Sequence, residues 1–211
     1  MDIPQPLLHG YRQFRAERYS VEAERYRALQ HGQTPQTMVI GCADSRVDPA
    51  TIFSARPGEL FVVRNVAALV PPYEESGTYH GTSAALEYAV RILKVESVVV
   101  LGHGLCGGVA AALAAAEHQS VGGFITPWVE LLADVRDDLL RRADCPDAAT
   151  RQRRLEHLAV LQSLENLMTF PFISKAVAEG RLTLDGAWFS IAEGQLQWFD
   201  RDCGEFCGLP D

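Results

Sequence analysis

Two cysteines and one histidine have the types and positions needed to bind a metal ion. Cys42 follows an apolar run at residues 37–40, and His103 and Cys106 follow a second apolar run at residues 97–101. Two thiolates and an imidazole form a soft ligand set, for which zinc is the expected ion. Three protein ligands would leave a fourth position open, which is the arrangement of a catalytic zinc site.

The spacing of His103 and Cys106 is weak evidence by itself, because many such pairs arise by chance. Glycines surround the pair and would let the backbone turn close to an ion. They are Gly102, Gly104, Gly107 and Gly108. A helix beginning after Cys106 would also favour the thiolate form of that residue. The presence of Cys42 at the end of a second strand is what raises the pair to a candidate metal site.

Asp44 and Arg46 follow Cys42 closely and could control the open position on the metal. The carboxylate of Asp44 could orient a zinc-bound hydroxide by accepting its hydrogen bond, or it could bind zinc as a fourth ligand and close the site. A bidentate ion pair with Arg46 would hold the carboxylate away from the metal. Without the cysteines, an ordinary surface ion pair would explain these two residues equally well.

These side chains need strands that end at one edge of a sheet. The apolar runs at residues 37–40, 60–63 and 97–101 are typical of strands buried on both faces. Two further segments, at 182–191 and 195–199, indicate a hairpin. The pattern predicts an α/β fold with a mainly parallel central sheet of four to five strands, an antiparallel edge strand and helices on both faces. The carboxyl ends of the parallel strands would then meet where ligands bind.

The length of 211 residues favours one domain, which we expect to span residues 1–211 with an N-terminal helical arm at residues 1–31. Residues 5–31 are amphipathic and precede the first strand. Two interpretations of the arm stay open: it packs on a partner subunit, or it covers the sheet of its own chain. Further helices are predicted at 82–93, 107–117, 127–139, 151–169 and 172–178, and a loop at 67–80.

The composition argues against several classes of protein. The chain is 47% apolar, so it can bury a sizeable core, and its formal charge of −8 argues against nucleic acid or a membrane surface as a partner. Its apolar runs are shorter than the roughly 20 residues that a membrane helix needs. The first residues lack the basic and apolar regions of a secretory signal, so we expect a cytoplasmic protein.

The five cysteines are an odd number, which argues against a disulfide framework. Cys203 and Cys207 lie together in a polar C-terminal segment. They could pair with each other or hold a metal, but the expected cytoplasmic location favours free thiols.

The chain resembles the β-class carbonic anhydrases over about residues 33–199. The motifs that carry the resemblance are Cys42-Ala43-Asp44-Ser45-Arg46 and Gly102-His103-Gly104-Leu105-Cys106-Gly107-Gly108, with further matching strings at 57–67 and 86–90. The resemblance implies Zn2+ bound by Cys42, His103 and Cys106. It also implies a catalytic dyad of Asp44 and Arg46. The implied reaction is the reversible hydration of carbon dioxide to bicarbonate and a proton by attack of zinc-bound hydroxide, in a homodimer or homotetramer.

The resemblance further implies a substrate pocket beside the zinc. By position, Gln33 resembles the side-chain amide that binds substrate, and the N–H of Gly107 resembles a donor to a substrate oxygen. Phe61, Val66 and Tyr88 resemble the apolar wall. A small apolar molecule such as carbon dioxide suits a dry wall with one or two donors. The alternatives are that these three residues belong to the core and that Gln33 is solvated in a turn.

Two features bear on the subgroup of the family. Members that close the site with the aspartate and respond to bicarbonate tend to carry Trp where this chain has Val39, although Arg64, another part of that regulatory pocket, is present. The resemblance therefore favours the open, plant-like subgroup, type I.

Two rival functions stay open: a hydrolase for carbonyl sulfide or carbon disulfide on the same scaffold, and a zinc-containing binding protein without turnover. Retention of Asp44 and Arg46 argues against the second, since a structural zinc needs neither. No histidine stands out as a proton shuttle. The candidates by ordinary pKa are His9, His31, His80, His118 and His157.

Overall fold

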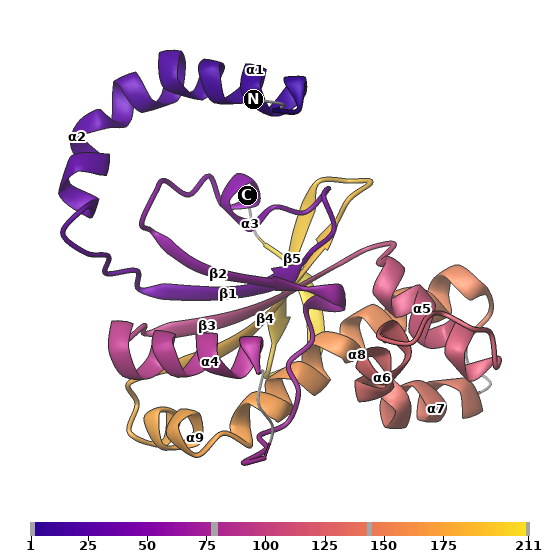
Figure 1. Ribbon diagram of the computed structural model, residues 1–211. Coiled ribbons are helices and arrows are strands. Elements are labelled where there is room, and N and C mark those ends of the chain that lie inside the picture. Colours follow the sequence, from indigo (N-terminus) through magenta and orange to yellow (C-terminus); the bar gives the residue numbers. More distant parts are fainter. Residues whose placement is uncertain (1–2, 77–79, 143–144, 210–211) are drawn as a thin grey trace.

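The computed structural model describes residues 3–76, 80–142 and 145–209, and it centres on one mixed sheet (Figure 1). The strands are β1 Thr37–Cys42, β2 Leu60–Asn65, β3 Ser97–His103, β4 Thr183–Ser190, β5 Gln195–Asp200 and β6 Glu205–Gly208. They lie in the order β2-β1-β3-β4-β5-β6. Strands β2, β1, β3 and β4 run parallel to one another, and β5 and β6 pair antiparallel at one edge of the sheet. The predicted α/β fold with a parallel centre and an antiparallel edge is confirmed.

The described sheet has six strands rather than four to five, because the polar C-terminal segment forms β6. This segment contains a single large apolar residue, Phe206, so no alternating pattern marks it as a strand. It pairs with β5, with Phe206 opposite Phe199 and Glu205 opposite Asp200. Gly204, at φ 74°, reverses the chain between the two strands. The strand therefore arises from pairing with β5 rather than from its own hydrophobic pattern.

The central strands bring their carboxyl ends to one edge of the sheet. Gly41 of β1 pairs with Leu101 of β3, and the two strands end shortly afterwards at Cys42 and His103. Nearly all residues of both strands are buried, as expected for parallel strands covered on both faces. The register therefore places these two side chains next to each other.

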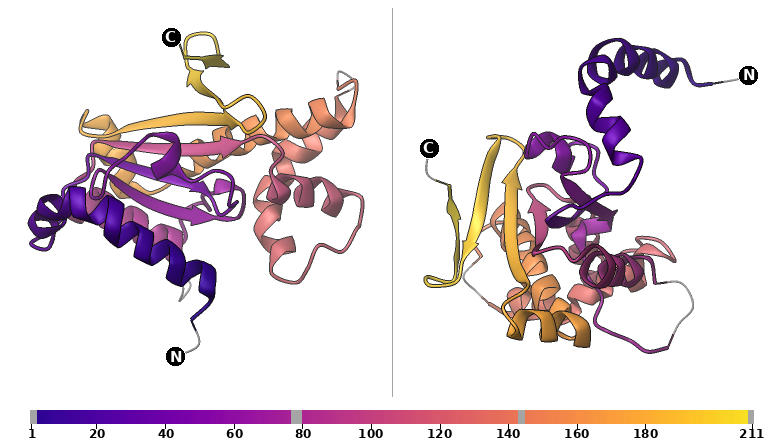
Figure 2. Two further views of the ribbon diagram at one scale, coloured as in Figure 1. Left: turned by 90° about the horizontal axis from the view of Figure 1, so that it is seen from above. Right: turned by 90° about the vertical axis from the view of Figure 1, so that its left-hand side faces the viewer.

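Helices cover the two faces of the sheet unequally. The larger core lies under α4 (Gly81–Glu87), α8 (Ala148–Met168) and α9 (Pro171–Ala178). On the other face, a smaller cluster of strand residues packs against side chains at the end of α3 (Pro49–Ile52). Three further helices extend beyond the carboxyl edge of the sheet and form a third cluster with α8 (Figure 2). They are α5 (Gly107–Ala116), α6 (Ile125–Val129) and α7 (Ala133–Arg141).

The remaining helical segments refine the predicted boundaries. The bounds are α5 Gly107–Ala116, α6 Ile125–Val129 and α7 Ala133–Arg141, with a π-helical segment at Tyr88–Leu93 and 3-10 turns at Val66–Ala68 and Glu130–Leu132. The single helix predicted at 127–139 is thus divided between α6 and α7. Of the predicted loop at 67–80, residues 77–79 lie outside the described residues. Across the described chain, no helix combines the length and apolar character required to cross a bilayer.

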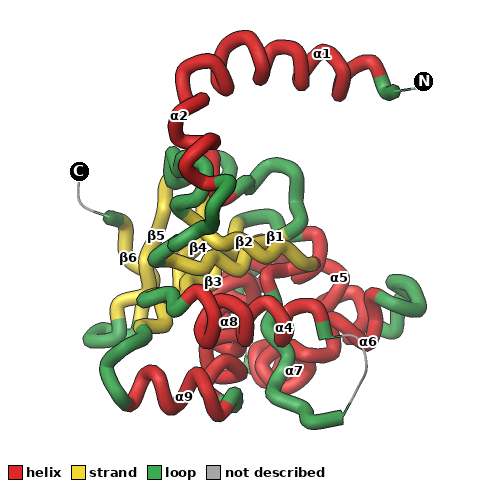
Figure 3. Tube along the Cα trace, turned by 60° about the vertical axis from the view of Figure 1, so that its left-hand side comes forward, coloured by secondary structure: helices red, strands yellow, loops and turns green. Residues whose placement is uncertain are grey.

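The N-terminal arm projects from the body of the protein (Figures 1 and 3). It consists of α1 (Gln5–Gln13), a π-helical segment (Phe14–Arg18) and α2 (Tyr19–Leu29), and none of these described residues is buried. Arg25 joins the arm to the body by donating hydrogen bonds to the Pro57 carbonyl (2.7 Å) and the Glu59 carboxylate (3.0 Å). The arm therefore does not cover the sheet of its own chain, and packing on a partner subunit stays a prediction.

Candidate metal centre

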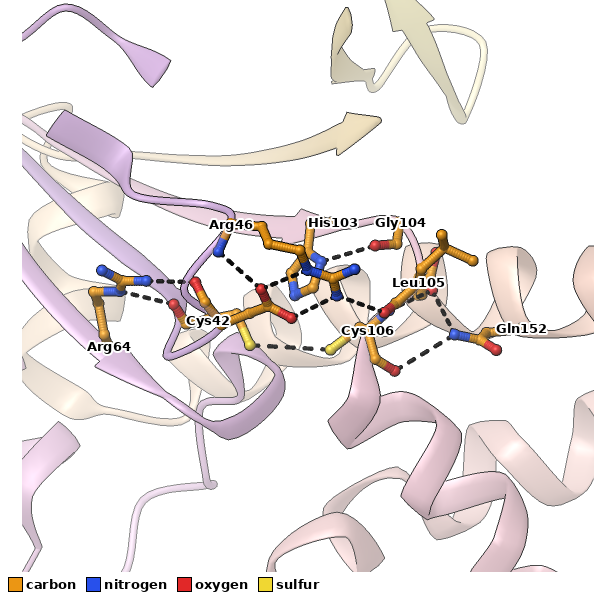
Figure 4. Close-up of polar contacts among 10 residues, drawn as sticks. Cys42, Arg46, Arg64, His103, Gly104, Leu105, Cys106 and Gln152 are labelled. Atoms are coloured by element: carbon orange, nitrogen blue, oxygen red, sulfur yellow. Dashed lines mark hydrogen bonds and ion pairs between the residues drawn. The ribbon is translucent and has the colours of Figure 1, made fainter. Parts of the chain in front are cut away.

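The ends of β1 and β3 and the start of α5 bring one nitrogen and two sulfur donors together (Figure 4). Cys42 ends β1, His103 ends β3, and Cys106 is the N-cap residue of α5. Their ligand atoms all lie within 4.8 Å of one another, and the two sulfurs are 4.0 Å apart. All three residues are buried. The structure thus gathers the three residues that the sequence predicts as metal ligands.

The imidazole of His103 is oriented to offer a lone pair. Its Nδ1 lies 2.9 Å from the carbonyl oxygen of Gly104, which can only accept, so Nδ1 carries the proton and Nε2 the lone pair. Nε2 is buried and has no hydrogen-bond partner among the described residues. A buried polar atom without a partner destabilises the fold, and a cation between Nε2 and the two sulfurs would supply that partner. The donor set and the unpartnered atom fit zinc.

The two buried thiols contact each other, and each shifts the pKa of the other. The hydrogen bond from Cys106 lowers the pKa of Cys42, and the same contact, together with burial, raises the pKa of Cys106. Backbone N–H groups at Asp44 and Ala67 add to the stabilisation of the Cys42 thiolate. Because metal ions bind thiolates, the lowered pKa of Cys42 favours cation binding at this residue.

Asp44 and Arg46 form a bidentate ion pair beside the three donors. Arg46 donates from Nε to Asp44 Oδ1 at 2.9 Å and from Nη2 to Oδ2 at 2.7 Å. The backbone N–H of Arg46 donates to Oδ1 at 3.0 Å, and Nη2 also reaches the carbonyl of Leu105 at 3.2 Å. These bonds hold the pKa of Asp44 well below its usual range, so the carboxylate stays ionised.

Arg64 of β2 stabilises the turn that carries Asp44. Its Nε donates to the carbonyl of Cys42 at 2.8 Å, and its Nη2 donates to the carbonyl of Asp44 at 2.6 Å. Its Nη1 lies 3.4 Å from the carboxylate of Asp48. All three nitrogens of the guanidinium are therefore engaged in holding the chain that follows β1.

Comparisons with known proteins agree with this geometry. A family model described as carbonic anhydrase matches residues 37–196, a range that contains all three donors. Beta carbonic anhydrase 3 of Arabidopsis thaliana is 32% identical over 206 residues, which cover 96% of this chain and 79% of that protein. The chain belongs to the β-carbonic anhydrase family. It is therefore an enzyme of the class that hydrates carbon dioxide.

Solved β-carbonic anhydrases share the whole fold. The structure of the β-carbonic anhydrase CcaA superposes with a TM-score of 0.92 at 30% identity, covering 97% of this chain and 98% of that one. The tetrameric β-carbonic anhydrases of the ascomycete Sordaria macrospora superpose with a TM-score of 0.81 at 31% identity, covering 98% of each chain. The likeness extends over nearly the whole chain.

Glu156 of α8 is a buried carboxylate behind the metal centre of this β-carbonic anhydrase, and our sequence analysis missed it. It accepts the backbone N–H of Cys106 at 3.0 Å, the indole N–H of Trp188 at 3.2 Å and the side-chain amide of Gln152 at 3.1 Å. Burial raises the pKa of Glu156. The sequence contains one indication of this residue. Glu156 lies four residues before Val160, so it places a charged group on the apolar face of the predicted helix.

The glycines of the second motif allow close packing rather than a turn. A Cβ at Gly102 would lie 2.6 Å from a methyl group of Val160, and one at Gly108 would lie 2.7 Å from a methyl group of Val66. The left-handed residue of this segment is Leu105, at φ 56°. The glycines therefore bring the end of β3 against α8 and the start of α5 against the 66–68 turn.

Two of the five predicted pocket residues lie at the metal centre. Gly107 is the first residue of α5, directly after Cys106. Val66 packs against the first turn of α5, and Trp128 donates to its carbonyl at 2.8 Å. The N-terminus of α5 therefore places both Gly107 and Val66 beside the three donors.

The other three predicted pocket residues lie apart from the metal centre within a single chain. Phe61 pairs with Met38, four residues before Cys42, which is about 13 Å along the strand. Its ring stacks on Tyr88 at a centroid distance of 5.9 Å. Gln33 precedes β1 and lines a surface hollow together with Tyr88. One chain therefore does not assemble all five residues into one pocket.

The histidines outside the metal centre offer no clear proton shuttle. Burial lowers the pKa of His157 to about 4, so this residue stays neutral at physiological pH. His9, His31 and His118 are exposed, and His80 is half-buried. The geometry singles out none of them.

Proposed function

We propose that this enzyme catalyses zinc-dependent, reversible hydration of carbon dioxide, with Cys42, His103 and Cys106 as the zinc ligands and the Asp44–Arg46 pair controlling the open position. The observation that carries the proposal is the buried, unpartnered Nε2 of His103 beside two sulfurs. The cluster contains three donors among the described residues, whereas a structural zinc site requires four.

Asp44 is suited to orient the attacking water. When bound, zinc would act as a Lewis acid and make water nucleophilic near neutral pH. Oδ1 of Asp44 accepts two hydrogen bonds from Arg46, but Oδ2 accepts only one, so Oδ2 retains an acceptor site. Because the carboxylate is ionised, it can only accept. The water must therefore point a hydrogen at Asp44, which leaves a lone pair for the carbon of the substrate.

The contacts around Asp44 support the open mechanism of the plant-like subgroup, in which the carboxylate does not bind the metal. Three hydrogen bonds from Arg46 hold Asp44, and a carboxylate that moved to the metal would have to break them. Val39 occupies the position at which the bicarbonate-responsive members tend to carry Trp. Arg64 is already engaged with the carbonyls of Cys42 and Asp44, which supports a structural role for this residue.

The substrate pocket is completed by a second copy of the chain in this proposal. Val66 and Gly107 would come from the subunit that holds the metal, and Gln33, Phe61 and Tyr88 from its partner. The separation of these two groups within one chain supports the proposal. The tetrameric state of the Sordaria macrospora relatives also supports it. The exposed arm would pack on the partner and give a homodimer or homotetramer.

A stopped-flow assay of carbon dioxide hydration tests the function directly. Purified enzyme should contain about one zinc per chain, the number that one ligand set holds. The Cys106→Ala variant should lose both zinc and turnover. If wild-type enzyme turned over carbonyl sulfide but not carbon dioxide, the rival hydrolase assignment would replace ours.

Mixing two inactive variants tests the shared pocket. A Cys106→Ala chain lacks the metal, and a Tyr88→Ala chain lacks part of the pocket. In a mixed dimer, one site combines the intact metal centre of the second chain with the intact pocket of the first, so activity should return. Mixed oligomers without any recovery would show that each chain builds its own pocket.

A further inference from the structure

The C-terminal hairpin carries a second pair of neighbouring thiols. Cys203 lies in the turn between β5 and β6, and Cys207 lies in β6, with 3.8 Å between their sulfurs. Both residues are exposed, and both are free thiols. The proposed hydration reaction uses neither of them.

The turn holds the two sulfurs close together through its backbone. The N–H of Gly204 donates to the carbonyl of Asp200 at 2.8 Å, and the N–H of Asp202 donates to the carboxylate of Asp200 at 2.8 Å. Cys207 is fixed by its place in the ladder, opposite Trp198 of β5. The sulfurs are therefore brought into contact by a hydrogen-bonded hairpin and not by chance contact between flexible ends.

We propose that Cys203 and Cys207 form a reversible dithiol–disulfide pair that exchanges with low-molecular-weight disulfides. The thiolate of Cys203 attacks one sulfur of the small disulfide, which breaks and releases its other half as a thiolate. Cys207 then gives up its proton to solvent and attacks the Cys203 sulfur, which expels the second half. The cysteine pair is oxidised by two electrons, and one small disulfide is reduced to two small thiols.

The order of attack follows from the contact between the thiols. The hydrogen bond with Cys203 raises the pKa of Cys207, which favours attack by Cys203 before Cys207. Both residues are exposed, so a small disulfide can approach the thiolate that attacks it. Cys203 is thus the nucleophile and Cys207 the resolving thiol.

A metal site at the same residues is the weaker interpretation. The carboxylate of Asp200 lies within 4.8 Å of both sulfurs, which gives three exposed donors among the described residues. One oxygen of that carboxylate already accepts the N–H of Asp202. The group contains no imidazole and no fourth donor, whereas structural zinc sites are closed by four ligands.

The disulfide would act on the edge of the sheet. The two cysteines are four residues apart, so closing the loop would hold β6 against the turn that leads to it. Phe206, next to Cys207, stacks on the imidazole of His157 at a centroid distance of 4.4 Å. Oxidation should therefore slow amide hydrogen exchange in β6, while the distant strands keep their exchange rates.

Treatment of the zinc-loaded, full-length enzyme with oxidised glutathione tests the proposal. The tryptic peptide that follows Arg201 contains both thiols. In the wild-type protein it should become lighter by two hydrogen atoms, and dithiothreitol should reverse the change. In Cys203→Ser and Cys207→Ser, the remaining thiol cannot be resolved, so a stable glutathione adduct should accumulate instead. Cys145→Ser, which removes a thiol elsewhere, should behave as the wild type does.

Three results would overturn the proposal. The first is a lasting glutathione adduct on the wild-type peptide, which would mean that the second thiol does not resolve it. The second is an unchanged peptide after prolonged treatment. The third is a second zinc per chain that protects the peptide and disappears in both serine variants, which would make the hairpin a metal site.

Discussion

The chain contains two pairs of cysteines with nearly equal sulfur–sulfur distances and different surroundings. The distance is 4.0 Å between Cys42 and Cys106 and 3.8 Å between Cys203 and Cys207. The first pair is buried and the second is exposed. An imidazole with an unpartnered nitrogen completes the first group, whereas an exposed carboxylate completes the second. Sulfur proximity alone therefore does not determine the chemistry of a cysteine pair.

Burial is the physical reason for the difference. Two buried thiols beside an imidazole have little water to stabilise the charge that they acquire on ionisation, so a divalent cation is strongly favoured there. The exposed pair is hydrated, and small oxidants can reach it. In our proposals, the same residue type thus serves metal binding in one place and redox exchange in the other.

The largest effect is expected from removing one sulfur of the buried pair. Cys42→Ser should abolish zinc binding and lower carbon dioxide hydration by at least about 1000-fold, since the nucleophilic water depends on the ion. Metal analysis and stopped-flow kinetics measure the two effects. The matched Cys203→Ser variant should keep its zinc and its rate. Equal losses in both variants would remove the distinction between the two pairs.

A smaller effect is expected at the carboxylate beside the buried pair. Asp44→Asn should keep the zinc and lower the hydration rate by about 100-fold, because an amide can donate where an ionised carboxylate only accepts. Glu87→Gln is the control, since Glu87 also pairs with an arginine, Arg91, at 2.7 Å. A full rate in Asp44→Asn would show that Asp44 does not orient the water.

Glu156 should affect metal affinity more than fold. Its carboxylate accepts hydrogen bonds from three N–H groups, one of them the backbone N–H of Cys106. The side-chain amide of a glutamine would place its own N–H opposite one of these three N–H groups. Glu156→Gln should weaken zinc binding by about 10-fold, the scale reported for groups that orient metal ligands. Competition with a chelator measures the affinity. Glu165→Gln, at an exposed position of the same helix, should leave zinc binding unchanged.

The smallest effect concerns His157, whose imidazole contacts the rings of Trp188 in β4 and Phe206 in β6. Burial lowers its pKa to about 4, so in the folded state it binds a proton less readily than in the unfolded chain. Its contribution to stability is therefore fully present above pH 6.5, the ordinary value, and is lost as the pH falls toward 4. Allowing for the solvent that reaches the ring, we expect about 1 kcal/mol.

Urea unfolding at several pH values measures this effect of His157. The His157→Phe variant should lose the dependence between these two pH values while keeping the ring contact with Phe206. If the variant and the wild type lost stability in parallel over this range, another group would be responsible.

Much of the fold could be predicted from the sequence because it depends on local patterns. The run Ser97–His103 is apolar until it reaches the glycines, so both the strand and the position of its end are visible. β6 could not be predicted in this way. Its residues become a strand only because β5 offers unpaired backbone groups after the turn at Gly204.

The sequence by itself determined which side chains form the candidate metal centre. Cys42 and His103 end adjacent parallel strands and Cys106 starts the next helix, so the pattern alone brings them to one edge. Only the tertiary structure decided the surroundings of these donors. Glu156 reaches Cys106 because α8 packs behind β3, and Gln33 lies apart from the candidate metal centre because it precedes β1, which ends at Cys42. Such contacts depend on how distant segments pack, which no local periodicity records.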